Sequence, residues 1–365
     1  TWEKVTTLDL GLDARFFNDA LGVTFDWYNR TTSDILTTAN LPATLGADAP
    51  YENMGTIQTK GWELAIDYRH TFKNGLHFGV TASVADDKTE VTKWTYNTKI
   101  PSYGATGWWD KSAYKEGMVL GDIWGLQFDR FLTEDDFNAD GSLKAGLPDQ
   151  TKVFPAGYQF APGDVLYKDL DNNGEIVKQT NTNDKGDLSV IGNALPRLQF
   201  GLNLDAAWKG FDISMFFQGV AKRKLWAAGN QVLPGFTTGE PFYKGAEDYW
   251  TPENTDAFYP RPMDYKQSAS GNYSVNDRYL LNMAYLRLKT FTVGYSLPKV
   301  WLSKFKVQGL RVYFTGENLF TIDGVKPAID PEIGIRTASG KSDQRNFGRS
   351  YPYQKTVSFG IQLSL

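Results

Sequence analysis

Several residue types that carry common protein chemistry are scarce or missing in this chain. It has no cysteine, which excludes disulfides, thiolate metal sites and cysteine nucleophiles but fits any compartment. Its only two histidines, His70 and His77, are too few for a zinc cluster or a catalytic triad. The net charge of −4 argues against a nucleic-acid partner. No apolar run reaches the ~18 residues of a membrane helix, and the chain begins without methionine, so we expect a processed product or a fragment.

Aromatic residues and glycine are abundant instead. Phe, Trp and Tyr make up 15% of the chain, beside 35 glycines, and apolar residues alternate with polar ones over most of the sequence. This period of two predicts β-strands almost throughout. We expect antiparallel strands within residues 6–36, 59–91, 196–226, 282–320 and 353–365.

The expected strands run for ~9–12 residues, which is the length that crosses a bilayer when tilted and exceeds the usual ~5–6 of soluble sheets. One face carries Asp9, Asp13, Asp26, Asn203 and Asp205, as a watery lumen requires, while the other is nearly uncharged. Trp27, Tyr28, Trp208 and Phe217 near strand ends fit interfacial girdles. The pattern favours an all-β, antiparallel transmembrane β-barrel, and a soluble sandwich is the alternative.

The connections between strands alternate in length. Short turns near 18–22, 73–75, 209–210 and 298–304 alternate with long segments at 37–58, 92–195, 227–281 and 321–352. This alternation predicts nine spanning strands, with 92–195 as one large external excursion between two of them. Single-chain barrels have even strand numbers, and large plugged transporters have about 22 strands. Residues 1–365 therefore form part of a larger barrel.

The order of motifs resembles the C-terminal half of the SusC/RagA family of TonB-dependent outer-membrane transporters from Bacteroidetes. Departures are Leu365, where the family usually ends in phenylalanine, and the absence of the N-terminal plug domain, the TonB-contacting segment and the first part of the barrel. The matching segments are Leu21–Leu36, Asn53–Glu63, Pro162–Ile176, Ile191–Gly219, Tyr285–Pro298, Gly316–Phe320 and Asp330–Glu332.

The resemblance implies active import of a large nutrient across the bacterial outer membrane, with an oligosaccharide preferred and a peptide as the other choice. It also implies a SusD-like surface lipoprotein as a lid and the TonB complex as the energy source. No enzyme motif stands out in the sequence. Two other classes stay open: a secreted glycan-binding or glycan-active all-β protein, and a passive porin or adhesin barrel.

Aromatic residues in the long segments are candidate ligand contacts, because flat rings stack on sugar faces or grip peptide side chains. Packing within the loops, or contact with the lid, is the alternative for each ring. The candidates are Trp108, Trp109, Trp226, Tyr243, Trp250 and Tyr259.

One stretch, Tyr167–Ile176, has the spacing of a calcium loop. Asp169, Asp171 and Asn173 supply side-chain oxygens at the first, third and fifth positions, Gly174 allows a sharp turn, and the Glu175 carbonyl follows. Thr180 stands where such loops carry a bidentate glutamate, so Asp187 or Asp184 must supply the remaining carboxylate. We expect a structural Ca²⁺ that shapes the 92–195 excursion, with a metal-free Asp/Asn/Gly turn as the alternative.

Overall fold

The fold is described from a computed structural model. It describes residues 2–38, 50–95, 115–181, 184–227, 229, 231–235, 243–263, 271–302, 307–326, 329–332, 337–338, 341–342 and 351–364.

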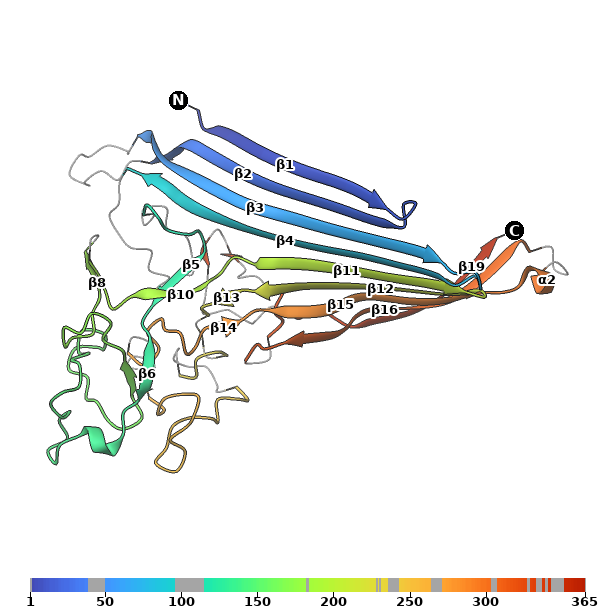
Figure 1. The fold of residues 1–365 in the computed structure, drawn as a ribbon. Coiled ribbons are helices and arrows are strands. Elements are labelled where there is room, and N and C mark those ends of the chain that lie inside the picture. Colours follow the sequence, from blue (N-terminus) through green and yellow to red (C-terminus); the bar gives the residue numbers. More distant parts are fainter. Residues whose placement is uncertain are drawn as a thin grey trace.

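A single antiparallel sheet of nine strands forms the body of the molecule (Figure 1). Each strand pairs with the next of the nine along the chain, and β4 pairs directly with β11 although residues 95–196 lie between them. The nine spanning strands expected from the sequence are thus confirmed. They are β1 (Lys4–Phe16), β2 (Leu21–Thr38), β3 (Tyr51–Thr71), β4 (His77–Trp94), β11 (Arg197–Trp208), β12 (Phe211–Lys222), β15 (Tyr285–Ser296), β16 (Gly309–Asp323) and β19 (Thr356–Ser364).

The short turns lie at one end of the sheet, and the long connections gather at the other (Figure 1). Lys209 and Gly210 both have positive φ, 49° and 88°, which gives a two-residue hairpin turn whose twist matches that of the flanking strands. Between β15 and β16 the turn contains the short helix α2 (Lys299–Leu302). This end corresponds to the periplasmic turns of an outer-membrane barrel.

Some strands are longer than the expected ~9–12 residues. β2 and β4 have 18 residues each and β3 has 21. Pairing between β2 and β3 continues to Thr38 and Tyr51, so both described ends of the segment expected to be a loop, 37–38 and 51–58, are strand. The ladder resumes beyond a register shift at Ile35, where Ile35 pairs with Gly55 and Leu36 with Asn53, and so extends past the expected strand ends.

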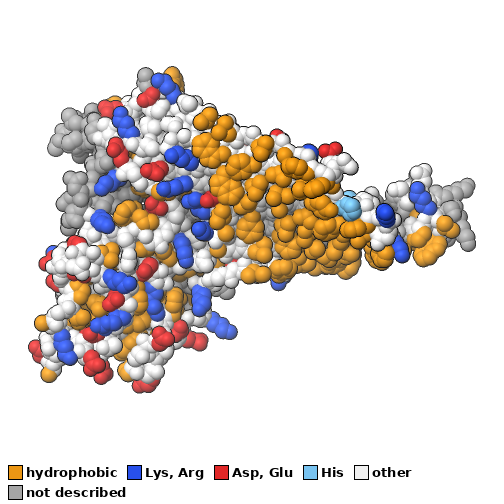
Figure 2. Space-filling model, in the orientation of Figure 1, with side chains coloured by type: hydrophobic (Ala, Val, Ile, Leu, Met, Phe, Trp, Pro, Cys, Tyr) orange, Lys and Arg blue, Asp and Glu red, His pale blue; other side chains and the backbone are white. Residues whose placement is uncertain are grey.

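Apolar side chains cover the outer face of the sheet as a continuous belt (Figure 2). The register places Leu12 opposite Phe25, Phe25 opposite Leu64, and Leu64 opposite Val84, and cross-strand partners share a face. Leu10, Leu12, Phe359 and Ile361 are 59%, 60%, 83% and 73% exposed. An exposed apolar surface of this extent fits lipid contact rather than the buried core of a soluble sandwich.

The belt ends where the outer face becomes charged. Beyond Leu64 and Val84, the next outward pairs are Trp62 with Asp86 and Lys60 with Lys88. Asp86 forms an ion pair with Arg197, whose Nε lies 2.5 Å from Asp86 Oδ1. This change marks the outer boundary of the lipid-facing surface.

The girdle assignment of Tyr28 is wrong. Trp27 shares the outer face with Trp62, but a neighbouring residue in a strand points the opposite way. The Tyr28 ring lies on the inner face, against Gly61.

The described parts of the two long connections, 95–196 and 223–284, pack together into one body beyond the sheet. One hydrophobic cluster joins Ile123 to Trp226 and Tyr279, and another joins Leu126 to Trp250. Buried Asp164 links the two connections, because it accepts hydrogen bonds from Arg261 Nε at 2.8 Å and Asn272 Nδ2 at 2.9 Å.

Short elements shape this body. The patch 117–131 contains two short strands that pair with later parts of the same excursion, β5 with β10 and β6 with β7. Among the described residues, no helix is long and apolar enough to cross a membrane. The elements are β5 (Asp122–Gly125), β6 (Phe128–Phe131), a 3₁₀ turn (Glu134–Asp136), β7 (Val165–Tyr167), β8 (Lys178–Asn181), β9 (Asp184–Gly186), β10 (Ser189–Asn193), β13 (Lys224–Leu225) and β14 (Leu281–Asn282), with β17 (Thr337–Ala338) and β18 (Lys341–Ser342) between β16 and β19.

Candidate functional site

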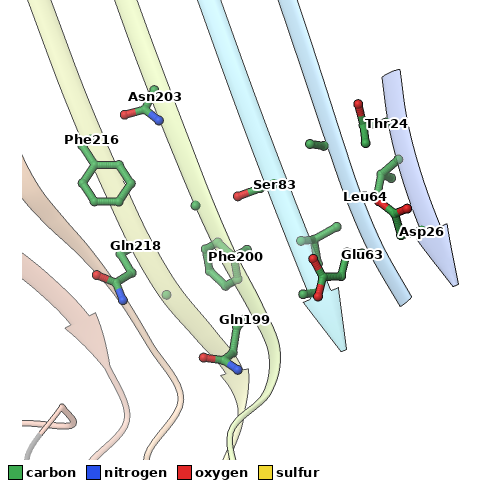
Figure 3. Close-up of a pocket in the computed structure, with 15 residues that line it drawn as sticks. Thr24, Asp26, Glu63, Leu64, Ser83, Gln199, Phe200, Asn203, Phe216 and Gln218 are labelled. Carbon is green, nitrogen blue, oxygen red and sulfur yellow. The ribbon is translucent and has the colours of Figure 1, made fainter. Parts of the chain in front are cut away.

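The inner face of the sheet holds a hollow of about 530 Å³. Figure 3 shows side chains of β11 and β12 on one side of it, those of β2 and β3 on the other, and Ser83 of β4 between them. The Phe216 ring lies along the wall beside Gly201. A Cβ atom at position 201 would lie 3.5 Å from a carbon of this ring. The polar side chains that line the hollow include Asp26, Glu63, Ser83, Gln199, Asn203 and Gln218.

Some acidic side chains elsewhere on the inner face have cationic partners. Arg15 reaches over Gly22 to Asp67, with Nη1 2.7 Å from Oδ2. Arg311 reaches over Gly294 to Asp212, with Nε 2.9 Å from Oδ1. A side chain at either glycine would block these bridges, which lie flat against the wall.

Asp26 and Glu63 differ from those paired carboxylates. They stand directly opposite each other in the β2–β3 register, an arrangement of like charges that destabilises a sheet. Within the described chain, neither forms an ion pair or a side-chain hydrogen bond, and the same is true of the Gln199 and Gln218 amides. The hollow therefore presents free polar groups to whatever fills the lumen.

Residues 329–332, between β16 and β19, are held against the inner face by β15. Arg287 of β15 is 3% exposed and forms ion pairs with Asp330 and Glu332. Lys289 Nζ also binds Glu332, at 3.0 Å, and the backbone N–H of Tyr353 donates to Asp330 Oδ2 at 3.0 Å. Burial opposes ionisation of Asp330, but these hydrogen bonds outweigh it and lower its pKa.

The aromatic residues expected to contact ligand lie in different surroundings. Trp226, Trp250 and Tyr259 are buried in the two loop clusters, as the packing alternative requires, and burial raises the pKa of Tyr259 to about 12. Tyr243 is 38% exposed. Trp108 and Trp109 lie outside the described residues. The structure does not bring the four described rings together into one site, and their role in ligand binding stays a prediction.

The Asp169–Gly174 loop brings three carboxylates together. Oxygens of Asp169, Asp171 and Asp187 lie within 4.8 Å of one another, close enough for one Ca²⁺ with Ca–O distances of about 2.4 Å to contact all three. Asp187 is fully buried and accepts from the backbone N–H groups of Leu170 at 2.8 Å and Val177 at 2.7 Å. It therefore holds both ends of the loop.

The other proposed ligands have partners within the protein. Asn173 donates from Nδ2 to Asp171 at 3.0 Å and accepts from the Glu175 N–H at 2.8 Å, and the Glu175 carboxylate pairs with Lys152. Asp169 Oδ1 is buried and, among the described residues, has no hydrogen-bond partner. Such an orphaned acceptor fits a cation, whereas the Asn173 bonds also fit a metal-free turn.

Comparison with known proteins assigns the fold to a family. The model of the TonB-dependent receptor-like β-barrel matches residues 1–319, most of the chain. The chain belongs to this family. It is an all-β, outer-membrane type of barrel, as the sequence predicts.

Relatives extend the match over the whole chain. TonB-dependent receptor P3 of Formosa agariphila is 28% identical over 374 residues, and TonB-dependent receptor SusC of Bacteroides thetaiotaomicron is 24% identical over 373 residues. These alignments cover 99% and 100% of this chain but 34% and 32% of the relatives, so the chain spans about a third of their length. Neither relative is named as an enzyme, in agreement with the prediction that this chain is not one.

A solved structure shares the fold. The RagAB peptide transporter superposes with a TM-score of 0.69 at 21% identity, over 99% of this chain and 35% of that one. The resemblance to SusC and RagA noted in the sequence is thereby confirmed.

Proposed function

We propose that the chain forms part of the wall and outer loops of a TonB-dependent transporter that imports a large nutrient across the outer membrane. A SusD-like surface lipoprotein covers the outer loops, and the TonB complex supplies energy through parts of the protein outside residues 1–365. The membership in the receptor β-barrel family and the likeness of this whole chain to about a third of SusC support this proposal.

The nine-stranded sheet with its apolar outer belt is the observation that carries the proposal. Its two edge strands, β1 and β19, leave unpaired backbone groups that a bilayer would not tolerate, so further strands must close the barrel. A secreted soluble protein would not expose such a belt to water. A passive porin would share the barrel, but the match to TonB-dependent receptors favours active transport.

An oligosaccharide is the preferred nutrient and a peptide is the second choice. The solved relative is a peptide transporter, which supports the second. The curated relatives are named only as receptors.

Uptake by whole cells tests the proposal. Cells carrying the full-length gene should accumulate labelled nutrient, and cells lacking that gene or TonB should not. Accumulation that persists without TonB would indicate a passive pore, and equal accumulation without the gene would refute transport.

We also propose that Asp169, Asp171 and Asp187 hold a structural Ca²⁺, with the Asn173 side chain and the Glu175 carbonyl as further ligands. The orphaned Asp169 oxygen and the convergence of three carboxylates support it. The ion would stabilise the 92–195 excursion without taking part in transport, and the metal-free turn is the outcome to be tested against it.

A further inference from the structure

We propose that Lys60 and Lys88, on the outer face of the sheet at the loop-side edge of the apolar belt, hold the phosphate group of a lipid in the outer leaflet of the membrane. The belt contacts acyl chains, and this lysine pair adds a defined site for a headgroup at its edge. The inference goes beyond the proposed import function, because it does not depend on which nutrient passes through the barrel.

The height of the lysine pair follows from the strand register. Along β3, Leu64 is the last apolar residue of the belt, and Trp62 and then Lys60 follow it on the same face toward the loops. Lys60 lies four residues beyond Leu64, which is about 13 Å along the strand and roughly 10 Å in height at a tilt of ~40°. The headgroup layer adds roughly 5–8 Å to each side of the hydrocarbon core, so a lysine side chain at this height reaches it.

The two lysines face each other across neighbouring strands. Lys60 and Lys88 are direct partners in the β3–β4 register, which places their Cβ atoms about 4.5–5.5 Å apart. Both residues are exposed, and like charges directly opposite each other destabilise a sheet. Two ammonium groups at this separation can donate to oxygens of one phosphate group, which removes their repulsion.

The nearest carboxylate leaves the pair available to an anion. In the described part of the chain Lys60 forms no ion pair. Lys88 contacts Glu90, but Nζ lies 3.5 Å from Oε2 and the two side chains are 49% and 43% exposed. An exposed pair at this distance contributes little, so a phosphate can compete with Glu90 for the Lys88 ammonium.

Further cations follow along the same edge of the belt. Asp86, which precedes Lys88 by two residues on the outer face of β4, is neutralised by Arg197 of β11. Lys222 of β12 stands opposite Arg197 in the register. Figure 2 shows Lys and Arg side chains gathered along the loop-side edge of the belt. A phosphate at the lysine pair therefore meets a surface of net positive charge.

Continuity with the belt identifies the occupant as a lipid. Phe25 and Leu64 form an outward pair within the belt, and the outward pair of Trp27 and Trp62 lies between them and Lys60. A lipid with its acyl chains on the first pair and its phosphate at the lysines contacts all three levels in order, and tryptophan suits the interface between them. A soluble anion would use only the lysines.

Lipid retention by the full-length transporter with its lipoprotein tests this inference. The complex is stripped of lipid in a non-ionic detergent and incubated with diphosphorylated lipid A or with the same lipid A after phosphatase treatment, and retained lipid is counted by native mass spectrometry. We expect the phosphorylated form to be retained about tenfold better, because each lysine near a lipid phosphate contributes about fivefold. Inorganic phosphate at equal concentration should not displace it.

The double variant Lys60→Gln with Lys88→Gln removes the charge of the pair. It should lose most of the preference for the phosphorylated form, and high salt should lower the preference of the wild type in the same direction. Because the change also removes like-charge repulsion, the variant should be at least as stable as the wild type in lipid-free detergent. Lys73→Gln, in the short turn at the other end of β3, is the matched control and should keep the wild-type preference.

Equal retention of the two forms of lipid A, an unchanged preference in the double variant, or an equal loss in Lys73→Gln would overturn the inference. Displacement by inorganic phosphate would assign the lysines to a soluble anion. A double variant that dissociates into smaller complexes but keeps its lipid would assign them to an interface between copies of the protein. Either result would also overturn the inference, whereas the import function is judged separately by TonB-dependent uptake in cells.

Discussion

Arg287 on β15 and Asp330, 43 residues later, form an ion pair in which Nη2 lies 2.7 Å from Oδ1 and each side chain is 4% exposed. Arg287 also pairs with Glu332 and donates to the Thr321 hydroxyl at 2.8 Å. One buried guanidinium thus fixes the segment after β16 to the inner face of the barrel.

Replacing Arg287 by methionine should release this segment. This substitution leaves the Asp330 and Glu332 carboxylates without their main partner. Removing one partner of a buried ion pair lowers stability by about 3–5 kcal/mol. Hydrogen exchange at residues 329–332 and 351–355 should accelerate at least about a hundredfold. Arg15→Met, which removes a pair whose arginine is 56% exposed, is the control and should cost at most about 1 kcal/mol. Equal effects of the two changes would contradict the anchoring role.

The sequence predicted those features that depend on local periodicity. Alternation and turn lengths predict nine strands and the lumen-facing side of residues such as Asp9 and Asp26, but a girdle position for both Trp27 and its neighbour Tyr28 conflicts with the same alternation. Strand ends were less predictable, because the β2–β3 ladder resumes after a register shift at Ile35, which the alternation of residues does not indicate.

Contacts across long sequence distances were not predictable from the pattern. Asp330-Pro331-Glu332 was recognised as a family segment, but nothing in its spacing indicated Arg287 as partner. Likewise, the roles of Trp226 and Trp250 depend on two excursions that pack together, which a single sequence does not reveal. Gln199 and Gln218 lie at alternate positions that face the lumen. This alternation of polar residues is the only indication of the hollow that the sequence contains.

If the Asp169 loop binds Ca²⁺, the backbone of this loop should become more rigid when the ion is added. Adding Ca²⁺ to the chelator-treated full-length transporter should slow hydrogen exchange across residues 169–177, and Tb³⁺ should show sensitised luminescence there. Asp171→Asn should weaken binding about tenfold or more, since it removes a charged ligand but keeps the turn geometry. Asp140→Asn, in a separate exposed turn of the same excursion, is the control. No response to either ion would favour the metal-free turn.

The Arg130–Asp136 pair predicts acid sensitivity in the excursion. Hydrogen bonds from Arg130, at 2.6 and 2.8 Å, outweigh burial and lower the pKa of Asp136 to about 2. Because the folded pKa is below the unfolded value of about 3.9, the pair stabilises fully above pH ~4 and loses this contribution as pH falls toward ~2. Proteolysis by pepsin around residues 130–137 should rise through this window. Asp136→Asn should flatten the profile, and an unchanged profile would contradict the pairing.

An arginine should impair assembly at one residue of β19 and be tolerated at the next. Phe359 is 83% exposed on the lipid-facing belt, while its neighbour Ser358 points to the lumen with Thr315. Arginine at position 359 must be desolvated in the bilayer, which costs about 2–4 kcal/mol near the midplane and less near an interface. Ser358→Arg meets water and should cost little. Surface levels of the full-length protein, measured with heat-modifiable gel mobility, should fall for Phe359→Arg alone, and normal assembly of that variant would refute the placement of this face in lipid.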